Sequence, residues 1–193
     1  MDLKKIGQFC KKAGCVRIVY HPGSKCLWVG DGKAMWLCDE GVDINRQNCG
    51  AMLDIDIDDS ISVTEGDSDL AMYDGYRMYA NVDVCEVLGC GVIHNRAMLA
   101  LKPQDEDRIG IIPFEYAKMV KDEDERSYLL LPGPGKLERP VCAVLEGMYV
   151  RLLVALRDTE ETEDFVRMAG RIARMEPYED GKAEQTRMED TGE

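Results

Sequence analysis

The stretch Leu-Trp-Val-Gly-Asp-Gly-Lys-Ala-Met-Trp-Leu at residues 27–37 places an Asp-Gly pair, at 31–32, between two apolar runs. Glycine accepts the positive φ of a tight turn and aspartate tolerates it, so this pattern is the strongest local sign of a β-hairpin. Asp-Gly also interrupts an apolar run at 74–75, and Glu-Gly, which is a weaker turn signal, interrupts one at 146–147. The chain is therefore predicted to be a meander of antiparallel strands.

The first half opens with an amphipathic helix predicted over residues 2–13, which Asp2 can cap and Gly14 ends. Its apolar residues gather on one side and its lysines on the other. The further elements expected are strands at 16–20, 26–30 and 33–38, a short helix at 45–54, and strands at 82–88 and 92–101 separated by Gly-Cys-Gly at 89–91.

The order of helix, three strands and helix recurs in the second half. Pro113 opens a short helix predicted to run to Val120. The later elements expected are strands at 127–131, 140–145 and 148–156, a helix at about 161–175, and a disordered acidic tail at 176–193. Two unrelated stretches of strands and short helices are the alternative, because such combinations are common.

We therefore predict an α+β fold of antiparallel β-sheets with short helices, in two topologically similar halves. The expected parts are an N-terminal α+β half at 1–88, a C-terminal α+β half with a terminal helix at 89–175, and the tail at 176–193. With 45% hydrophobic residues among 193, the chain can bury a substantial core.

Charge and cysteine content narrow the class of protein. The formal net charge of −13 argues against a generally basic nucleic-acid coat, but it leaves room for a local basic face. The eight cysteines are scattered at positions that suit small apolar residues, and no signal-peptide pattern precedes them. We expect reduced, mostly buried thiols in a cytoplasmic protein, and no apolar run is long enough to span a membrane.

Two stretches resemble metal sites. Residues 54–65 place oxygen ligands at the first, third, fifth and twelfth positions of an EF-hand calcium loop, but the sixth position has Asp59 in place of glycine. Alternating Ile and Asp in this segment equally describes a strand with one solvated face. Cys85, Cys90 and His94 lack knuckle spacing and a fourth ligand, which favours two buried thiols and a histidine near a strand end.

No catalytic signature accompanies these segments. His21 and His94 are the only histidines, and neither has a local nucleophile motif such as Gly-x-Ser-x-Gly. The glycine-rich turns at 30–32 and 133–135 do not match a phosphate loop. We expect a protein that is not an enzyme, with no catalytic residue, bound metal or cofactor.

Two predicted helices carry basic faces opposite their apolar faces. Such a face can meet nucleic-acid phosphates through a non-specific, salt-sensitive attraction, although a solvated face balanced by nearby carboxylates is the alternative. The candidate DNA-contacting residues are Lys4, Lys5, Lys11, Lys12, Arg167, Arg171 and Arg174.

The pattern resembles the DNA polymerase sliding clamps, the processivity factors. The resemblance rests on the order of elements over residues 1–175, on Asp-Gly-Tyr-Arg-Met at 74–78, and on the closing strand at 149–157. It implies several subunits closing into a ring, basic helix faces toward the DNA backbone, and a polymerase or other replication protein as partner. The pattern is also similar to proteins of this size from phages or mobile elements.

The function predicted from the sequence is a non-enzymatic, sliding-clamp-like protein that encircles or contacts DNA as a homo-oligomer. The alternative is an acidic protein–protein interaction module of phage or host origin without nucleic-acid contact. In that case the exposed anchors expected are Trp28, Trp36, Tyr73 or Tyr76.

Overall fold

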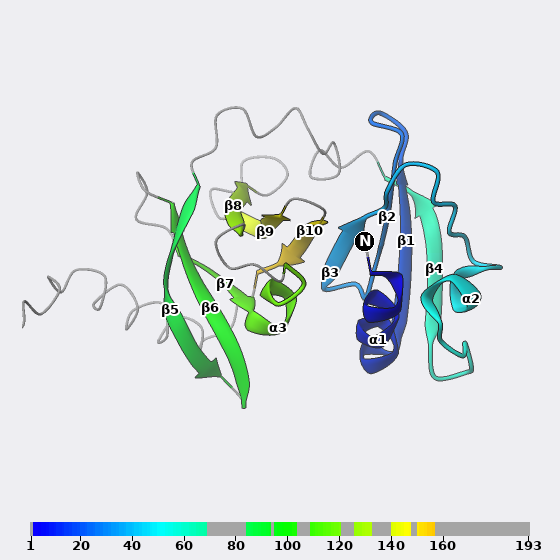
Figure 1. Cartoon of the computed structure of the whole chain (residues 1–193), viewed down its shortest axis with the longest axis horizontal. Coiled ribbons are helices and arrows are strands. Elements are labelled where there is room, and N and C mark those ends of the chain that lie inside the picture. Colours follow the sequence, from blue (N-terminus) through cyan, green and yellow to red (C-terminus); the bar gives the residue numbers. More distant parts are fainter. Residues whose placement is uncertain are drawn as a thin grey trace, which may run out of the picture.

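The computed structural model describes residues 2–68, 84–93, 95–103, 109–120, 126–132, 140–147 and 150–156. In these residues the chain folds into a seven-stranded sheet of order β4-β1-β2-β3-β10-β9-β8 and a three-stranded sheet of order β5-β6-β7 (Figure 1). The helices are α1 (Leu3–Ala13), α2 (Cys49–Leu53) and α3 (Phe114–Ala117). The strands are β1 (Cys15–His21), β2 (Cys26–Gly30), β3 (Ala34–Leu37), β4 (Ser62–Asp67), β5 (Cys85–Ile93), β6 (Arg96–Pro103), β7 (Gly110–Pro113), β8 (Ser127–Pro132), β9 (Pro140–Gly147) and β10 (Val150–Ala155). The predicted α+β class is confirmed.

Both ends of α1 follow from local sequence. The Asp2 carboxylate accepts a hydrogen bond from the Lys5 backbone N–H at 3.1 Å, which caps the first turn. Gly14 adopts a left-handed conformation at φ 66° and closes the last turn. Ile6 and Cys10, both 0% exposed, lie on the side that faces the core. The predicted helix at 2–13 is confirmed.

The Asp-Gly turn between β2 and β3 is also confirmed. Gly32 has φ +81°, and the Asp31 carboxylate accepts the backbone N–H groups of Lys33 at 2.9 Å and Ala34 at 2.7 Å. Asp31 is only 5% exposed, so its charge is stabilised mainly by these backbone donors and by one side-chain donor described below. The antiparallel pair β2–β3 follows directly from this turn.

The seven-stranded sheet joins two three-stranded meanders. β1, β2 and β3 follow one another on one side, β8, β9 and β10 on the other, and β3 pairs antiparallel with β10 where they meet. Residues far apart in the chain therefore share one sheet, with Leu152 beside Trp36 and Val154 beside Ala34. The predicted duplication of two halves, and the domain boundaries at 88 and 175, stay predictions.

One strand pair departs from an antiparallel meander. β4 runs parallel to β1, with Cys15 beside Ser62 and Tyr20 beside Asp67. The chain leaves β3, passes through α2 and returns along the open edge of β1, which is the longer crossover connection that a parallel pair needs.

The predicted break at residues 89–91 is wrong. β5 continues through it to Ile93 and pairs with β6, and the chain turns at Asn95, which has φ 58°. The register shifts between Val87 and Gly89, so the chain here forms a β-bulge and not a turn. Other boundaries also differ: α2 spans only Cys49–Leu53 of the helix predicted at 45–54, α3 ends at Ala117, and residues 146–147 belong to β9 although the β9–β10 hairpin is confirmed. The predicted turn at 74–75, helix at 161–175 and tail at 176–193 lie outside the described residues.

The main core lies on one face of the seven-stranded sheet. All three helices pack there, through residues such as Ile6, Leu53 and Tyr116, against Trp36 and Leu152 of the sheet. The opposite face buries a smaller cluster of Val19, Trp28, Met35, Leu129 and Leu153. The three-stranded sheet contributes Leu99, Leu101 and Ile112 to the main core.

Candidate functional site: the surface around helix α1

Helices α1 and α3 lie side by side over the seven-stranded sheet (Figure 1). The Phe9 ring of α1 lies 5.2 Å from the Tyr116 ring of α3 and 5.5 Å from the Trp36 ring of β3, centroid to centroid. The Trp36 and Tyr116 rings are 6.0 Å apart in an edge arrangement. This aromatic cluster fixes both helices on the sheet and positions the surface above them.

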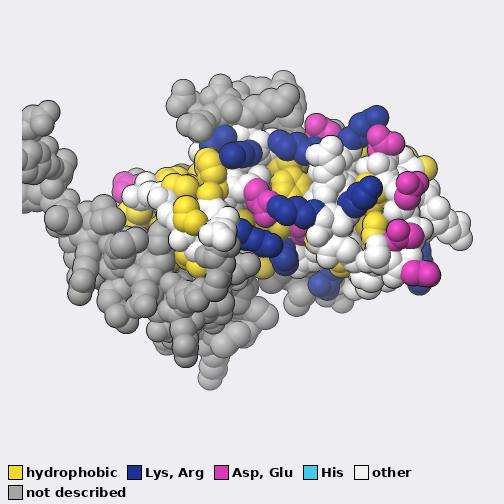
Figure 2. All heavy atoms as spheres, turned by 90° about the horizontal axis from the view of Figure 1, so that it is seen from below, with side chains coloured by type: hydrophobic (Ala, Val, Ile, Leu, Met, Phe, Trp, Pro, Cys, Tyr) yellow, Lys and Arg dark blue, Asp and Glu magenta, His cyan; other side chains and the backbone are white. Residues whose placement is uncertain are grey.

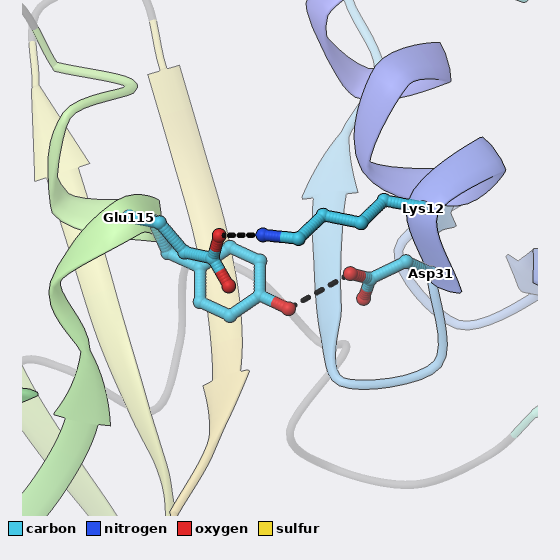
Figure 3. A network of polar contacts seen from close by, with 4 residues as sticks. Lys12, Asp31 and Glu115 are labelled. Carbon is cyan, nitrogen blue, oxygen red and sulfur yellow. Dashed lines mark hydrogen bonds and ion pairs between the residues drawn. The ribbon is translucent and has the colours of Figure 1, made fainter. Parts of the chain in front are cut away.

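A polar network joins the same elements at their boundary (Figure 3). The Tyr116 hydroxyl donates to the Asp31 carboxylate at 2.8 Å, inside the protein. Nearby, the Lys12 ammonium lies 2.6 Å from the Glu115 carboxylate. Burial, reinforced by the neighbouring Asp31 charge, raises the pKa of Tyr116 well above its usual value. The network therefore ties the β2–β3 turn and α1 to α3.

Of the four predicted lysines of α1, Lys4, Lys11 and Lys12 are exposed and Lys5 is half-buried, and three of the four have local partners. The Lys4 ammonium is 3.0 Å from the Asp54 carboxylate, and the Lys5 ammonium donates to the Lys118 carbonyl at 3.0 Å. Lys12 pairs with Glu115 as above, and Lys11 is exposed. The face seen from below carries several Lys and Arg side chains with Asp and Glu between them (Figure 2).

The second predicted basic stripe, Arg167, Arg171 and Arg174, lies outside the described residues. The prediction that these arginines contact DNA therefore stays a prediction. Sequence reasoning missed Lys118, whose backbone carbonyl accepts the hydrogen bond from the Lys5 ammonium of α1. The Lys118 ammonium lies 5.0 Å from the Phe114 ring centroid. A single lysine after a four-residue helix carries no periodic signal that could have pointed to it.

The acidic segment at 54–65 does not form an EF-hand loop. Asp54 ends α2 in a left-handed conformation and pairs with Lys4, while Glu65 lies in β4 and accepts the Arg46 backbone N–H at 2.7 Å. The Asp58 carboxylate accepts the backbone N–H and hydroxyl of Ser60, and these bonds lower its pKa. The carboxylates of Asp54, Asp58 and Glu65 therefore each interact with a different residue. Within the described ranges, no group of three His, Cys, Asp or Glu residues could hold a metal.

The cysteines divide by exposure. Within the described part of the chain, Cys10, Cys38, Cys49 and Cys85 are buried, as predicted, and Cys15 and Cys26 are half-buried. Cys90 is exposed, which corrects the prediction that Cys85 and Cys90 are both buried. Five positions apart on β5, the two thiols occupy different environments, and His94 lies outside the described residues.

The local partner of His21 was missed in the sequence. Its Nδ1 accepts the Ser24 backbone N–H at 3.1 Å and lies 2.9 Å from the Ser24 hydroxyl. The sequence pattern that could have indicated this contact is His-Pro-Gly-Ser at 21–24, which places the serine three residues after the histidine. Because the same nitrogen receives the backbone donor, the pair closes the β1–β2 turn, and His21 is only 5% exposed.

Two of the four aromatic anchors proposed for the alternative function are buried. Trp28 and Trp36 are both 0% exposed, so the prediction that they are available to a partner is wrong. Each points into one of the two clusters that flank the seven-stranded sheet. Tyr73 and Tyr76 lie outside the described residues.

The buried thiols predict how stability changes with pH. Burial, aided by the charge of Asp31, raises the pKa of Cys10 to about 12, and burial beside Asp39 does the same for Cys38. Above pH 9 these two thiols lose their protons in the unfolded chain, whereas in the folded chain they keep them until about pH 12. The free energy of unfolding should therefore fall as pH rises through this window, by about 1.4 kcal/mol per pH unit for each thiol.

Urea unfolding across this pH window measures the slope. Cys38→Ala should make it shallower, whereas the exposed-site variant Cys90→Ala should leave it unchanged. Equal slopes for Cys38→Ala and the wild type would contradict the assignment.

No protein-family model, no curated protein and no solved structure matches the chain. None of the helices in the described part of the chain combines the length and apolar character needed to cross a bilayer.

Proposed function

We propose that this protein is a non-enzymatic, sliding-clamp-like protein that contacts the DNA backbone through the basic face of α1 and acts as an oligomer. The observation that carries the proposal is the placement of α1 and α3 side by side on one face of a sheet shared by two meanders. Lys4, Lys11 and Lys12 of α1 are exposed at this surface, and Lys5 and Lys12 reach across to α3. This arrangement supports a surface that displays cationic groups to the DNA backbone.

The Asp54 partner of Lys4 does not prevent this lysine from contacting phosphate. The Lys4–Asp54 pair is solvent-exposed, with side chains 76% and 64% exposed, and such surface pairs contribute about 0–1 kcal/mol. A phosphate can therefore replace Asp54 at little cost. Release of counterions from DNA supplies the favourable free energy, and it requires only that the cations approach the backbone.

Two buried thiols are poor candidates for nucleophilic catalysis. Nucleophilic cysteines need a lowered pKa and partial exposure, whereas burial raises the pKa of both Cys10 and Cys38 to about 12. At neutral pH these two groups remain protonated and packed in the core. The alternative interaction module loses Trp28 and Trp36 as anchors, because both are buried.

Duplex-DNA binding measured by fluorescence anisotropy over a series of salt concentrations tests the proposal. The wild type should bind weakly with a steep salt dependence, and Lys4→Glu with Lys11→Glu should reduce affinity at low salt at least about tenfold. The slope of log K against log salt should become shallower by about 0.9 for each phosphate that the variant no longer neutralises.

The matched control changes Lys25 and Arg46 to glutamate, because both residues are exposed, lie outside α1 and give the same change in charge. Equal losses in both double variants would mean that net charge, and not the face of α1, governs binding. A wild type that does not bind DNA at low salt would refute the DNA contact, and a monomer at all concentrations would refute encirclement.

A further inference from the structure

Strand β5 lies at the outer side of the three-stranded sheet, where its one strand partner within the described ranges is β6. It displays large apolar side chains to solvent: Val87 is 48% exposed and Val92 is 72% exposed, and Val84 just before the strand is 54% exposed. Gly89 and Cys90 between them are also exposed, and a Cβ built at Gly89 would meet no atom within 4 Å. The backbone here is accessible to another chain.

The sequence of this strand lacks the usual protection of a sheet edge. Proteins commonly place lysine, proline or other charged residues on such strands to prevent pairing with further chains. Residues 89–93 read Gly-Cys-Gly-Val-Ile and contain no charge, although the chain as a whole carries −13. In β5 the one charged residue is Glu86, on the other side of the bulge.

We propose that residues 89–93 of β5 bind the same strand of a second copy in antiparallel orientation, which extends the three-stranded sheet across a two-fold axis. Pairing of edge strands supplies backbone hydrogen bonds, and the exposed valines supply apolar contact. The inference needs only the self-association part of the proposed function, and it does not depend on DNA contact.

The lack of charge makes this segment suitable for a second copy as the occupant. The repulsion between two chains of net charge −13 is screened by salt and is smallest where the contacting surfaces are locally uncharged, and residues 89–93 carry no charge. A two-fold interface also places the same patch on both sides. With the axis beside Gly91, Cys90 of each copy faces Val92 of the other, and the two Glu86 carboxylates lie at opposite ends.

Sedimentation velocity on the full chain tests this interface. The wild type should sediment as a dimer or larger assembly, and Val92→Lys should shift it toward the monomer by at least tenfold in dissociation constant, because charges would then face the apolar patch of the partner. Ile57→Lys is the matched control, since Ile57 is 41% exposed in the segment after α2. Its assembly should equal that of the wild type, and circular dichroism should show both variants folded.

Chemical cross-linking gives a second, independent measurement. The proposed pairing makes the two Cys90 residues diagonal neighbours, about 7–8 Å apart, so a short bis-maleimide should join wild-type chains into a covalent dimer and fail to join Cys90→Ser. A monomeric wild type, or assembly and cross-linking unchanged by Val92→Lys and Cys90→Ser, would overturn the inference. If the wild type still assembles and binds DNA through α1, only the β5 interface is refuted. A monomeric wild type that still binds DNA refutes encirclement as well and leaves the DNA contact of α1 standing.

Discussion

Replacement of Trp36 by alanine is expected to lower the free energy of unfolding by about 3–5 kcal/mol. Trp36 is 0% exposed on β3, and its ring contacts Phe9 of α1 and Tyr116 of α3. The same residue pairs with Leu152 where the two meanders join. The alanine variant loses the apolar burial of an indole and leaves a cavity beneath both helices, so the two costs add.

Urea unfolding followed by circular dichroism measures this loss. Tyr20→Ala is the control, because Tyr20 is an aromatic strand residue that is 40% exposed, and it should cost less than half as much as Trp36→Ala. Trp36→Phe should fall between wild type and alanine: it keeps an aromatic ring and removes a buried indole N–H that has no hydrogen-bond partner among the described residues. Equal stability of Trp36→Ala and Tyr20→Ala would contradict the central position of Trp36.

The elements that could be predicted are those whose signals lie within a few residues. Asp2 and Gly14 cap α1 from positions directly beside it, and the Asp-Gly turn at 31–32 contains both its positive φ and its carboxylate cap. The same logic failed at residues 89–91, because glycines there permit either a turn or a bulge. Only the pairing with β6 distinguishes the two outcomes.

The rest of the fold depends on partners that are distant in sequence. The parallel return of β4 beside β1 and the junction of β3 with β10 bring together strands without any shared local motif. The candidate site shows the same limit. Helical spacing placed the lysines of α1 on one side, but it could not identify Glu115 as the partner of Lys12, 103 positions away.

The position of the α1 lysines depends on both local and distant contacts. Helical spacing determines which side of α1 carries the lysines, whereas the orientation of α1 is determined by its close packing on α2 and by the aromatic cluster that it shares with α3. A change that displaces α1 without altering its charge should therefore affect the surface through position alone. Gly7, on the buried side of α1, offers such a change.

Gly7→Ala is expected to destabilise the protein by about 3 kcal/mol, at the upper end of the usual cost of overpacking. A Cβ on Gly7 would stand 2.1 Å from the Leu53 carbonyl oxygen of α2, and backbone atoms cannot rotate away as a side chain can. Helix propensity alone predicts the reverse, because alanine is favoured over glycine inside a helix by about 1 kcal/mol. The sign of the measured change therefore separates the local effect from the tertiary one.

Gly66→Ala is the matched control: Gly66 lies in β4, and a Cβ there would meet no atom within 4 Å. Its free energy of unfolding, measured by urea titration, should remain within about 0.5 kcal/mol of the wild type. Unchanged or increased stability of Gly7→Ala would contradict the close packing of α1 on α2. Since Asp54 directly follows Leu53 and pairs with Lys4, the displacement should also separate that ion pair, which links the packing of Gly7 to the position of the basic face.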